Sequence, residues 1–133
     1  MSDRADLRGR RLLVVDDDPA DRTAVAQLAR ACGCDVRAAG GHAEMTALMR
    51  AWAPELLVLD IVMPEVDGLG ILRQLAEQHC RTPVLLVSAY RDHLRPARNL
   101  GHAYGIKVVG ELTKPLESQA FATGLQNGFR DRW

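Results

Sequence analysis

The sequence lacks a net charge, because 17 lysines and arginines are matched by 17 aspartates and glutamates. A general attraction to nucleic acid or to an anionic membrane is therefore not expected. No apolar run comes near the roughly 20 residues that a membrane-spanning helix needs, and the first residues lack the apolar segment of a secretory signal. We expect a cytoplasmic protein that binds neither nucleic acid nor a membrane directly.

Cysteine is scarce, and Cys32, Cys34 and Cys80 are odd in number. No two of them have the spacing of a familiar metal site. Reduced, mostly buried thiols in a cytoplasmic protein fit this pattern better than a disulfide framework does. The chain also lacks a GxxxxGK(S/T) segment, which excludes a nucleotide-binding P-loop.

The composition is that of one globular domain. Hydrophobic residues make up 47% and charged residues 26% of the 133 residues, a balance that argues against disorder. A chain of this length can bury a real core, and no repeat or linker divides it. We predict a segment over residues 1–10 that leads into the domain, the domain itself over residues 11–128, and a tail or the beginning of a linker over residues 129–133.

Strand-like and helix-like segments alternate along the whole chain. We predict strands that end at or near positions 15, 39, 60, 88 and 113. Most are short, continuous apolar runs, which are typical of parallel strands that helices cover on both faces. Five βα units joined by right-handed crossovers predict an α/β sandwich with a doubly wound parallel sheet.

Helical spacing follows each predicted strand. Asp18-Pro19 marks the beginning of the first helix, because Asp is a favoured N-cap and Pro a favoured first residue. The second helix is predicted over residues 42–52, and the fourth over about residues 90–103. Pro96 fits only in the first turn of a helix, so we predict that this fourth helix begins late or is kinked.

Polar residues stand where the predicted strands end. Asp16 and Asp17 follow the first strand, and Asp60 ends the third. Ser88 ends the fourth strand, and Lys114 follows the fifth. Ligands of parallel sheets bind beyond the carboxyl ends of the strands. The sequence therefore predicts that acids, a hydroxyl and a lysine meet at one edge of the sheet.

These groups suit a divalent cation and a phosphoryl group. Two carboxylates about 4 Å apart repel by roughly 4 kcal/mol at an effective dielectric constant of 20. If the strand order is 2-1-3-4-5, Asp16, Asp17 and Asp60 need a cation or a lysine to offset that repulsion. Mg²⁺ binds one or two carboxylates together with water and phosphate oxygens. Asp60 could then attack a phosphoryl donor, and Ser88 and Lys114 could contact the phosphoryl oxygens.

Each of these residues also has an ordinary structural explanation. An aspartate after a strand is often a helix cap, as we predict for Asp18, and a single serine or Lys-Pro pair is common in loops. Their occurrence together at successive strand ends favours a functional site.

The segments LLVVDDDPADR, LLVLDIVMPEVDG, VLLVSAY and LTKPL occur in this order within about residues 11–127. Through them the chain resembles the receiver domain of two-component response regulators. The resemblance implies a flavodoxin-like (βα)5 fold with strand order 2-1-3-4-5 and Asp60 as the phosphoacceptor. It also implies that Asp17 and Asp60 ligate Mg²⁺ directly, or Mn²⁺ in its place, and that Asp16 acts partly through water.

The resemblance implies further roles and partners. The backbone carbonyl of Val62 would be another metal ligand, Ser88 the switch hydroxyl, and Lys114 the phosphoryl contact within a cis Lys114-Pro115 peptide. A sensor histidine kinase or phosphotransfer protein of a bacterial phosphorelay would donate the phosphoryl group. The face formed by the fourth helix, fifth strand and fifth helix would then switch to control an output domain or partner protein, and could also join two copies of the chain.

Two features bear on the output. Glu111 stands three residues before the lysine, where receivers usually carry a switch Tyr or Phe, and Tyr90 or Tyr104 could substitute. The segment over residues 100–116 contains GIKVVGELTKPL and resembles receivers that are fused to EAL-type cyclic di-GMP phosphodiesterase domains. An EAL domain is therefore one candidate output.

Two other functions compete with a phosphorylated receiver. Phosphatases of the haloacid-dehalogenase type need an Asp two residues after the nucleophile as general acid, and Val62 occupies that position, so we expect no enzyme. The remaining alternative is a phosphorylation-independent pseudo-receiver that acts as an interaction module. Glu111 favours it, whereas the complete set of acids, hydroxyl and lysine opposes it.

Overall fold

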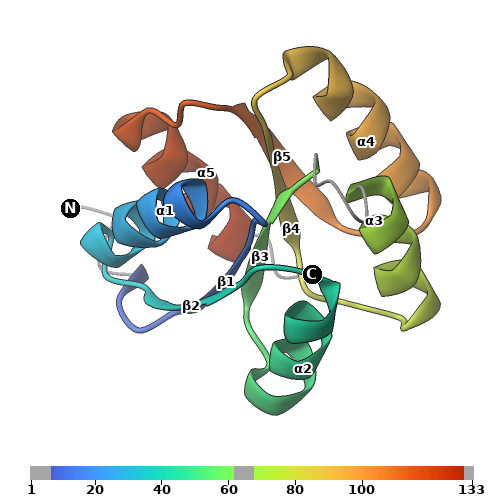
Figure 1. Cartoon of the computed structure of the whole chain (residues 1–133), viewed down its shortest axis with the longest axis horizontal. Helices are drawn as coiled ribbons and strands as arrows, with labels where there is room; N and C mark the ends of the chain where they lie inside the picture. The colour runs from blue at the N-terminus through green and yellow to red at the C-terminus, as the bar shows by residue number, and fades with distance from the viewer. Residues whose placement is uncertain (1–6, 62–67, 131–133) are drawn as a thin grey trace.

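Strands and helices alternate along the chain in the computed structural model, which describes residues 7–61 and 68–130 (Figure 1). The strands are β1 (Arg11–Val15), β2 (Asp35–Ala39), β3 (Leu56–Asp60), β4 (Val84–Ser88) and β5 (Val108–Thr113). The helices are α1 (Pro19–Ala31), α2 (His42–Trp52), α3 (Gly68–Glu77), α4 (Arg91–Ala103) and α5 (Ser118–Arg130). The predicted alternation is confirmed.

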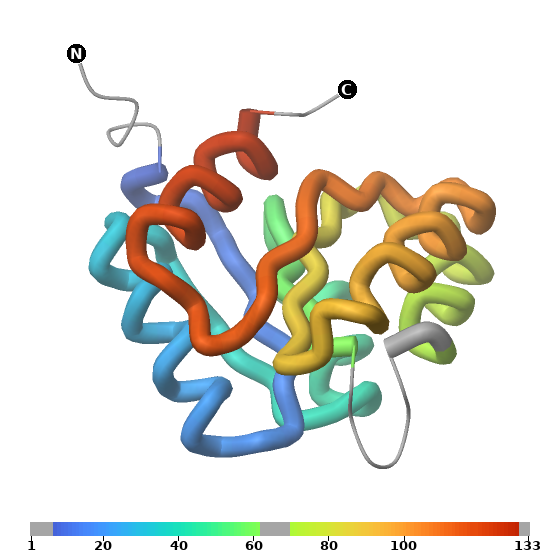
Figure 2. Tube along the Cα trace, turned by 90° about the horizontal axis from the view of Figure 1, so that it is seen from above, coloured from blue at the N-terminus to red at the C-terminus, as the bar shows by residue number. Residues whose placement is uncertain are grey.

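The five strands form one parallel sheet in the predicted order β2-β1-β3-β4-β5. Helices α1 and α5 cover one face, and α2, α3 and α4 cover the other (Figure 1). Figure 2 shows from a second direction that α1 lies beside α5 and that α3 lies beside α4. Because helices cover both faces, β1, β3 and β4 carry buried apolar side chains on both of their sides.

The central strand β3 shows how the sheet divides the core. All five of its residues are buried. Leu57 and Leu59 join the cluster under α2, α3 and α4, whereas Leu56 and Val58 join the cluster under α1 and α5, since successive strand side chains point to opposite faces. Its last residue, Asp60, is buried although it is acidic. The strand therefore delivers a carboxylate to the carboxyl edge of the sheet.

Helix α1 begins and ends as the sequence predicts. A side-chain oxygen of the N-cap Asp18 accepts a hydrogen bond from the backbone N–H of Asp21 at 2.9 Å, and Pro19 is the first helical residue. The helix ends before Gly33, which has a φ of 96° that glycine adopts without a Cβ clash. The cap keeps the first turn of α1 at the carboxyl edge of the sheet.

We predicted that the helix containing Pro96 begins late or is kinked, and the structure contradicts the late beginning. The helix begins at Arg91, so Pro96 is inside it and the late beginning is wrong. Proline removes one helical hydrogen bond, which would have joined its nitrogen to the carbonyl of Asp92. Both residues are exposed, so water can bind that carbonyl in place of the missing N–H. The kink stays a prediction.

The remaining sequence-based expectations differ little from the structure. β5 ends at Thr113, as predicted, and the Lys114-Pro115 peptide is cis, as predicted. α5 continues to Arg130, and the domain boundaries at residues 11 and 128 stay predictions. Of the three thiols, only that of Cys34 is buried, and Cys32 and Cys80 are half-buried. In the described ranges, every helix is too short or too polar to cross a membrane.

Candidate functional site

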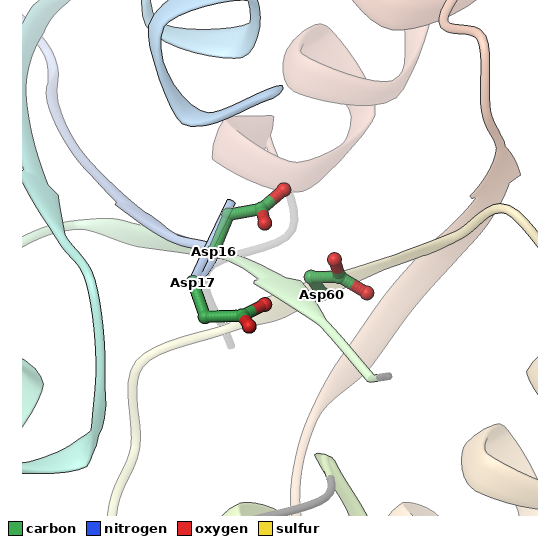
Figure 3. A group of neighbouring side chains, drawn as sticks. All are labelled: Asp16, Asp17 and Asp60. Carbon is green, nitrogen blue, oxygen red and sulfur yellow. The ribbon is translucent and has the colours of Figure 1, made fainter. Parts of the chain in front are cut away.

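Three aspartates meet at the carboxyl edge of the sheet. Asp16 and Asp17 follow β1, and Asp60 ends β3, which pairs with β1 in parallel register. Each of the three offers a carboxylate oxygen, and these oxygens lie within 4.8 Å of one another. Figure 3 shows the carboxylates gathered at the ends of the two strands. The sequence predicted this grouping from strand order, and the structure brings the three together.

Burial makes the Asp16 carboxylate costly to ionise. The residues Asp16 and Asp60 are 2% and 6% exposed, and Asp17 is half-buried. Burial raises the pKa of Asp16 above its ordinary value; a hydrogen bond from Lys114 opposes this, and the charge of Asp60 adds to it. A cation at this edge would remove that penalty, because it favours the ionised form of every nearby carboxylate.

One cation of the protein already lies in the cluster. The Nζ of Lys114 donates hydrogen bonds to Asp16 Oδ2 at 2.7 Å and to Asp60 Oδ2 at 2.9 Å. Although burial lowers it, these bonds and a third one raise the pKa of Lys114 well above its ordinary value. The predicted lysine thus joins the predicted acids, and it holds the Asp60 side chain directly.

The third partner of Lys114 is Asp21, which sequence reasoning missed. Asp21 Oδ2 lies 2.9 Å from the ammonium nitrogen, and the side chain is 49% exposed. Its position in the first turn of α1, three residues after the N-cap Asp18, was the available signal. An acid there faces the same edge of the sheet as the residues that precede the cap.

Arg22 was also missed, and it contacts the backbone of the site. Its Nη1 donates a hydrogen bond to the carbonyl oxygen of Asp16 at 2.9 Å. The Oδ1 of Asp16 accepts a further bond from the backbone N–H of Asp18 at 3.0 Å. These contacts fix the turn between β1 and α1, and so fix where the two neighbouring carboxylates point.

Ser88 lies at the end of β4 and is fully buried. Its Oγ accepts a hydrogen bond from the backbone N–H of Tyr90 at 2.9 Å. A hydroxyl that accepts one bond still has its proton to donate. The backbone carbonyl of Ser88 accepts a hydrogen bond from the backbone N–H of Lys114 at 2.8 Å. This bond joins the ends of β4 and β5, which carry the hydroxyl and the lysine.

Glu111 occupies the position where an aromatic residue was expected, and it forms an ion pair. Its Oε1 lies 3.4 Å from Nη1 of Arg98 on α4. Tyr104 follows the last residue of α4, roughly 20 Å of helix from the end that adjoins Ser88. Tyr90 lies beside Ser88 but is 57% exposed. The structure therefore places an ion pair between α4 and β5 at this position.

The donor set fits Mg²⁺. Carboxylate oxygens are the ligands that Mg²⁺ prefers, and it commonly binds one or two of them together with water. The half-buried Asp17 leaves one side of the cluster open to solvent, which such waters require. The predicted carbonyl ligand of Val62 lies outside the described residues.

A family model described as the response regulator receiver domain matches residues 12–126. The chain belongs to this family. The receiver is a signalling module, and the family binds Mg²⁺ at an acidic pocket such as the one described above.

Known regulators share sequence with the receiver. Transcriptional regulatory protein TrcR of Mycobacterium tuberculosis is 42% identical over 86 residues, which are 65% of this chain and 34% of TrcR. The C4-dicarboxylate transport transcriptional regulatory protein DctD of Pseudomonas aeruginosa is 33% identical over 123 residues, which are 91% of this chain and 25% of DctD. The receiver thus spans about a third of the first relative and a quarter of the second.

Solved structures share the fold. Chemotaxis protein CheY4 of Vibrio cholerae has a TM-score of 0.79 at 23% identity, over 90% of this chain and 98% of that one. The signal receiver domain of an HD domain-containing protein from Pseudomonas fluorescens has a TM-score of 0.81 at 19% identity, over 94% and 98% of the two chains. These likenesses confirm the flavodoxin-like fold.

Proposed function

We propose that this receiver accepts a phosphoryl group on Asp60, with Mg²⁺ bound beside it by Asp16, Asp17 and Asp60. The observation that carries the proposal is the direct bond between the Lys114 ammonium and the buried Asp60 carboxylate. A buried carboxylate with a lysine against it, next to two further acids, combines a nucleophile with positive charge for the incoming phosphoryl oxygens.

The donor in this proposal is a phosphohistidine of a sensor histidine kinase or of a phosphotransfer protein. An Oδ of Asp60 forms the new bond to phosphorus while the bond between phosphorus and the imidazole nitrogen breaks. The released imidazole keeps the electron pair of that bond and takes up a proton. When bound, Mg²⁺ supplies positive charge beside the phosphoryl oxygens.

Two residues of the chain convert the modification into a change of shape. Moving a two-state equilibrium from 1:99 to 99:1 takes roughly 5.5 kcal/mol, and a hydrogen bond to a charged group contributes roughly 1.5–3 kcal/mol. The Ser88 hydroxyl and the Lys114 ammonium could together supply most of that energy. Because Ser88 also holds the N–H of Tyr90, its movement would pull on the segment that leads into α4.

The switched surface is the face formed by α4, β5 and α5. It would control an output domain or partner protein of a bacterial two-component system in the cytoplasm, with an EAL domain as one candidate. The same face could join two phosphorylated copies of the chain. We further propose that the receiver domain spans residues 11–128. Unchanged amide chemical shifts on this face after phosphorylation would contradict the switch.

The alternative is a phosphorylation-independent interaction module. The ion pair between Glu111 and Arg98 favours it, because an ion pair replaces the usual aromatic switch residue. The intact group of three carboxylates and Lys114 opposes it. Like charges held this close destabilise the fold, and an interaction module without phosphoryl chemistry does not require them.

The deciding experiment is the intact mass of the protein after incubation with Mg²⁺ and acetyl phosphate, compared with Asp60→Asn. We expect one added phosphoryl group on the wild type and none on the variant. A wild-type mass that does not change, together with the absence of Mg²⁺ binding in a calorimetric titration, would favour the interaction module.

A further inference from the structure

The Lys114 ammonium has all of its hydrogen-bond donors occupied. Its Nζ lies 2.7 Å from Asp16 Oδ2, 2.9 Å from Asp21 Oδ2 and 2.9 Å from Asp60 Oδ2. A lysine ammonium has three N–H donors and no acceptor. Three carboxylates therefore take the three donors, and a phosphoryl oxygen can gain a bond from Lys114 only if one carboxylate gives up its own.

The three carboxylates differ in what this loss costs. The side chains of Asp16 and Asp60 are 3% and 8% exposed, whereas that of Asp21 is 49% exposed. A buried carboxylate that loses its cation pays the cost of desolvation, but an exposed one takes water in place of the ammonium. Asp21 is also outside the group of carboxylates that could hold a metal ion. In the resting protein without a bound metal, the bond between Lys114 and Asp21 is therefore the cheapest of the three to break.

We propose that Asp21 is a positioning residue that holds Lys114 in the resting receiver and releases it when Asp60 carries a phosphoryl group. Asp21 thereby competes with the phosphoryl oxygens for one N–H of Lys114 and favours the unphosphorylated state. This inference rests on the proposed function and deepens it. Asp21 forms no covalent bond, and the transfer of the phosphoryl group to Asp60 is unchanged.

The expected effect follows from the exposure of the pair. An ion pair with one half-exposed partner is screened by water, so its removal changes an equilibrium by roughly 1.4- to 5-fold. Asp21→Asn keeps the size of the side chain and removes its charge. This variant should therefore bind a phosphoryl mimic more tightly than the wild type by that factor.

The probe is trifluoroberyllate with saturating Mg²⁺, titrated into the full chain and followed by calorimetry. Mg²⁺ affinity is measured first for each variant, so that a change in metal binding is recognised separately. Asp18→Asn is the matched control: it removes the same charge three residues away, its amide oxygen still caps α1, and Asp18 forms no bond to Lys114 among the described contacts. Asp21→Glu restores the charge and should return the affinity toward that of the wild type.

A second readout follows the ammonium itself. Lys107 and Lys114 are the two lysines of the sequence, so ¹⁵N spectra of lysine-labelled protein contain two side-chain signals, and Lys107→Arg assigns them. Asp21→Asn should shift the Lys114 signal in the resting protein. In the trifluoroberyllate complex the signals of wild type and variant should coincide, because Lys114 has left Asp21 in both.

The outcomes separate the inference from the proposed function. Tighter trifluoroberyllate binding by Asp21→Asn than by Asp18→Asn, with Lys114 signals that converge in the complex, supports the competition. Equal affinities of these two variants, or a signal difference that persists in the complex, would overturn it while wild-type binding leaves the proposed function intact. A wild type that binds no trifluoroberyllate and gains no phosphoryl mass would overturn both.

Discussion

Lys114→Met should destabilise the receiver in the absence of Mg²⁺, because it removes the cation that offsets the carboxylates. At 4.8 Å, the limit that bounds the three-aspartate group, two carboxylates repel by about 3.5 kcal/mol at an effective dielectric constant of 20. Removing one partner of a buried ion pair costs roughly 3–5 kcal/mol. The Lys114 side chain is 12% exposed and Asp21 is half-exposed, so we expect the lower end, about 3 kcal/mol.

The assay is urea unfolding in the presence of a chelator. With a slope of about 1–3 kcal/mol per molar urea, the midpoint of Lys114→Met should fall by roughly 1–3 M. Mg²⁺ should narrow the difference in midpoint between the variant and the wild type, because the two positive charges of the metal replace the missing one. A ligand at 100 times its Kd stabilises a protein by about 2.7 kcal/mol. Arg95→Met, which removes the charge of an exposed residue on α4, should leave the midpoint nearly unchanged.

Two results would refute this reasoning. The first is a variant as stable as the wild type in chelator at low salt, which would mean that water already screens the carboxylates. The second is an equal stabilisation of both proteins by Mg²⁺, which would mean that the metal and the lysine do not neutralise the same charges.

Three further predictions concern the scaffold. Gly101→Ala should lower the free energy of unfolding, as measured by chemical denaturation, by about 1–3 kcal/mol. The added Cβ would lie 2.8 Å from a side-chain carbon of Val108. Glu55 has a lowered pKa although burial raises it, since the Arg11 N–H and nearby arginine charges favour the carboxylate. The pKa of Glu55 is lower in the folded than in the unfolded protein, so the stability that its carboxylate contributes is present at neutral pH and is lost as pH falls below about 4.5. The difference in unfolding free energy between wild type and Glu55→Gln should therefore shrink from pH 6 to pH 3. Burial raises the pKa of Cys34 to about 12, so iodoacetamide should modify this thiol slowest in the folded protein, as measured by peptide mass.

Each of these predictions has an internal comparison. Gly41→Ala should be tolerated, because its added Cβ would meet no atom within 4 Å beyond Gly41 itself and its two chain neighbours. A similar loss of stability at both glycines would contradict the clash. A difference for Glu55→Gln that is constant with pH would show that charge contributes nothing there. Cys32 and Cys80 are half-buried, and modification of Cys34 as fast as of these two would contradict its burial.

The fold and the grouping of the acids could be predicted because both depend on local patterns. Continuous apolar runs such as Leu56–Leu59 identify strands that are covered on both faces. Parallel strands end at one edge, so Asp16 and Asp60 had to be neighbours once β1 and β3 paired. Asp18 capped its helix as predicted, since capping involves only residues within one turn. The late beginning of α4 was wrong because exposure of Pro96 to water, which decides its cost, is a property of the folded surface.

The sequence by itself therefore determined the strands, the edge of the sheet at which the site lies and the residue types that meet there, whereas the strand order was predicted from the family resemblance. Only the tertiary structure decided how the charges pair. Lys114 and Asp21 are 93 residues apart in sequence, and Arg98 reaches Glu111 from a neighbouring element. Such pairs depend on where the first turn of one helix lies relative to the end of a strand. That distance results from the packing of whole elements through the core, and no local pattern of residues encodes it.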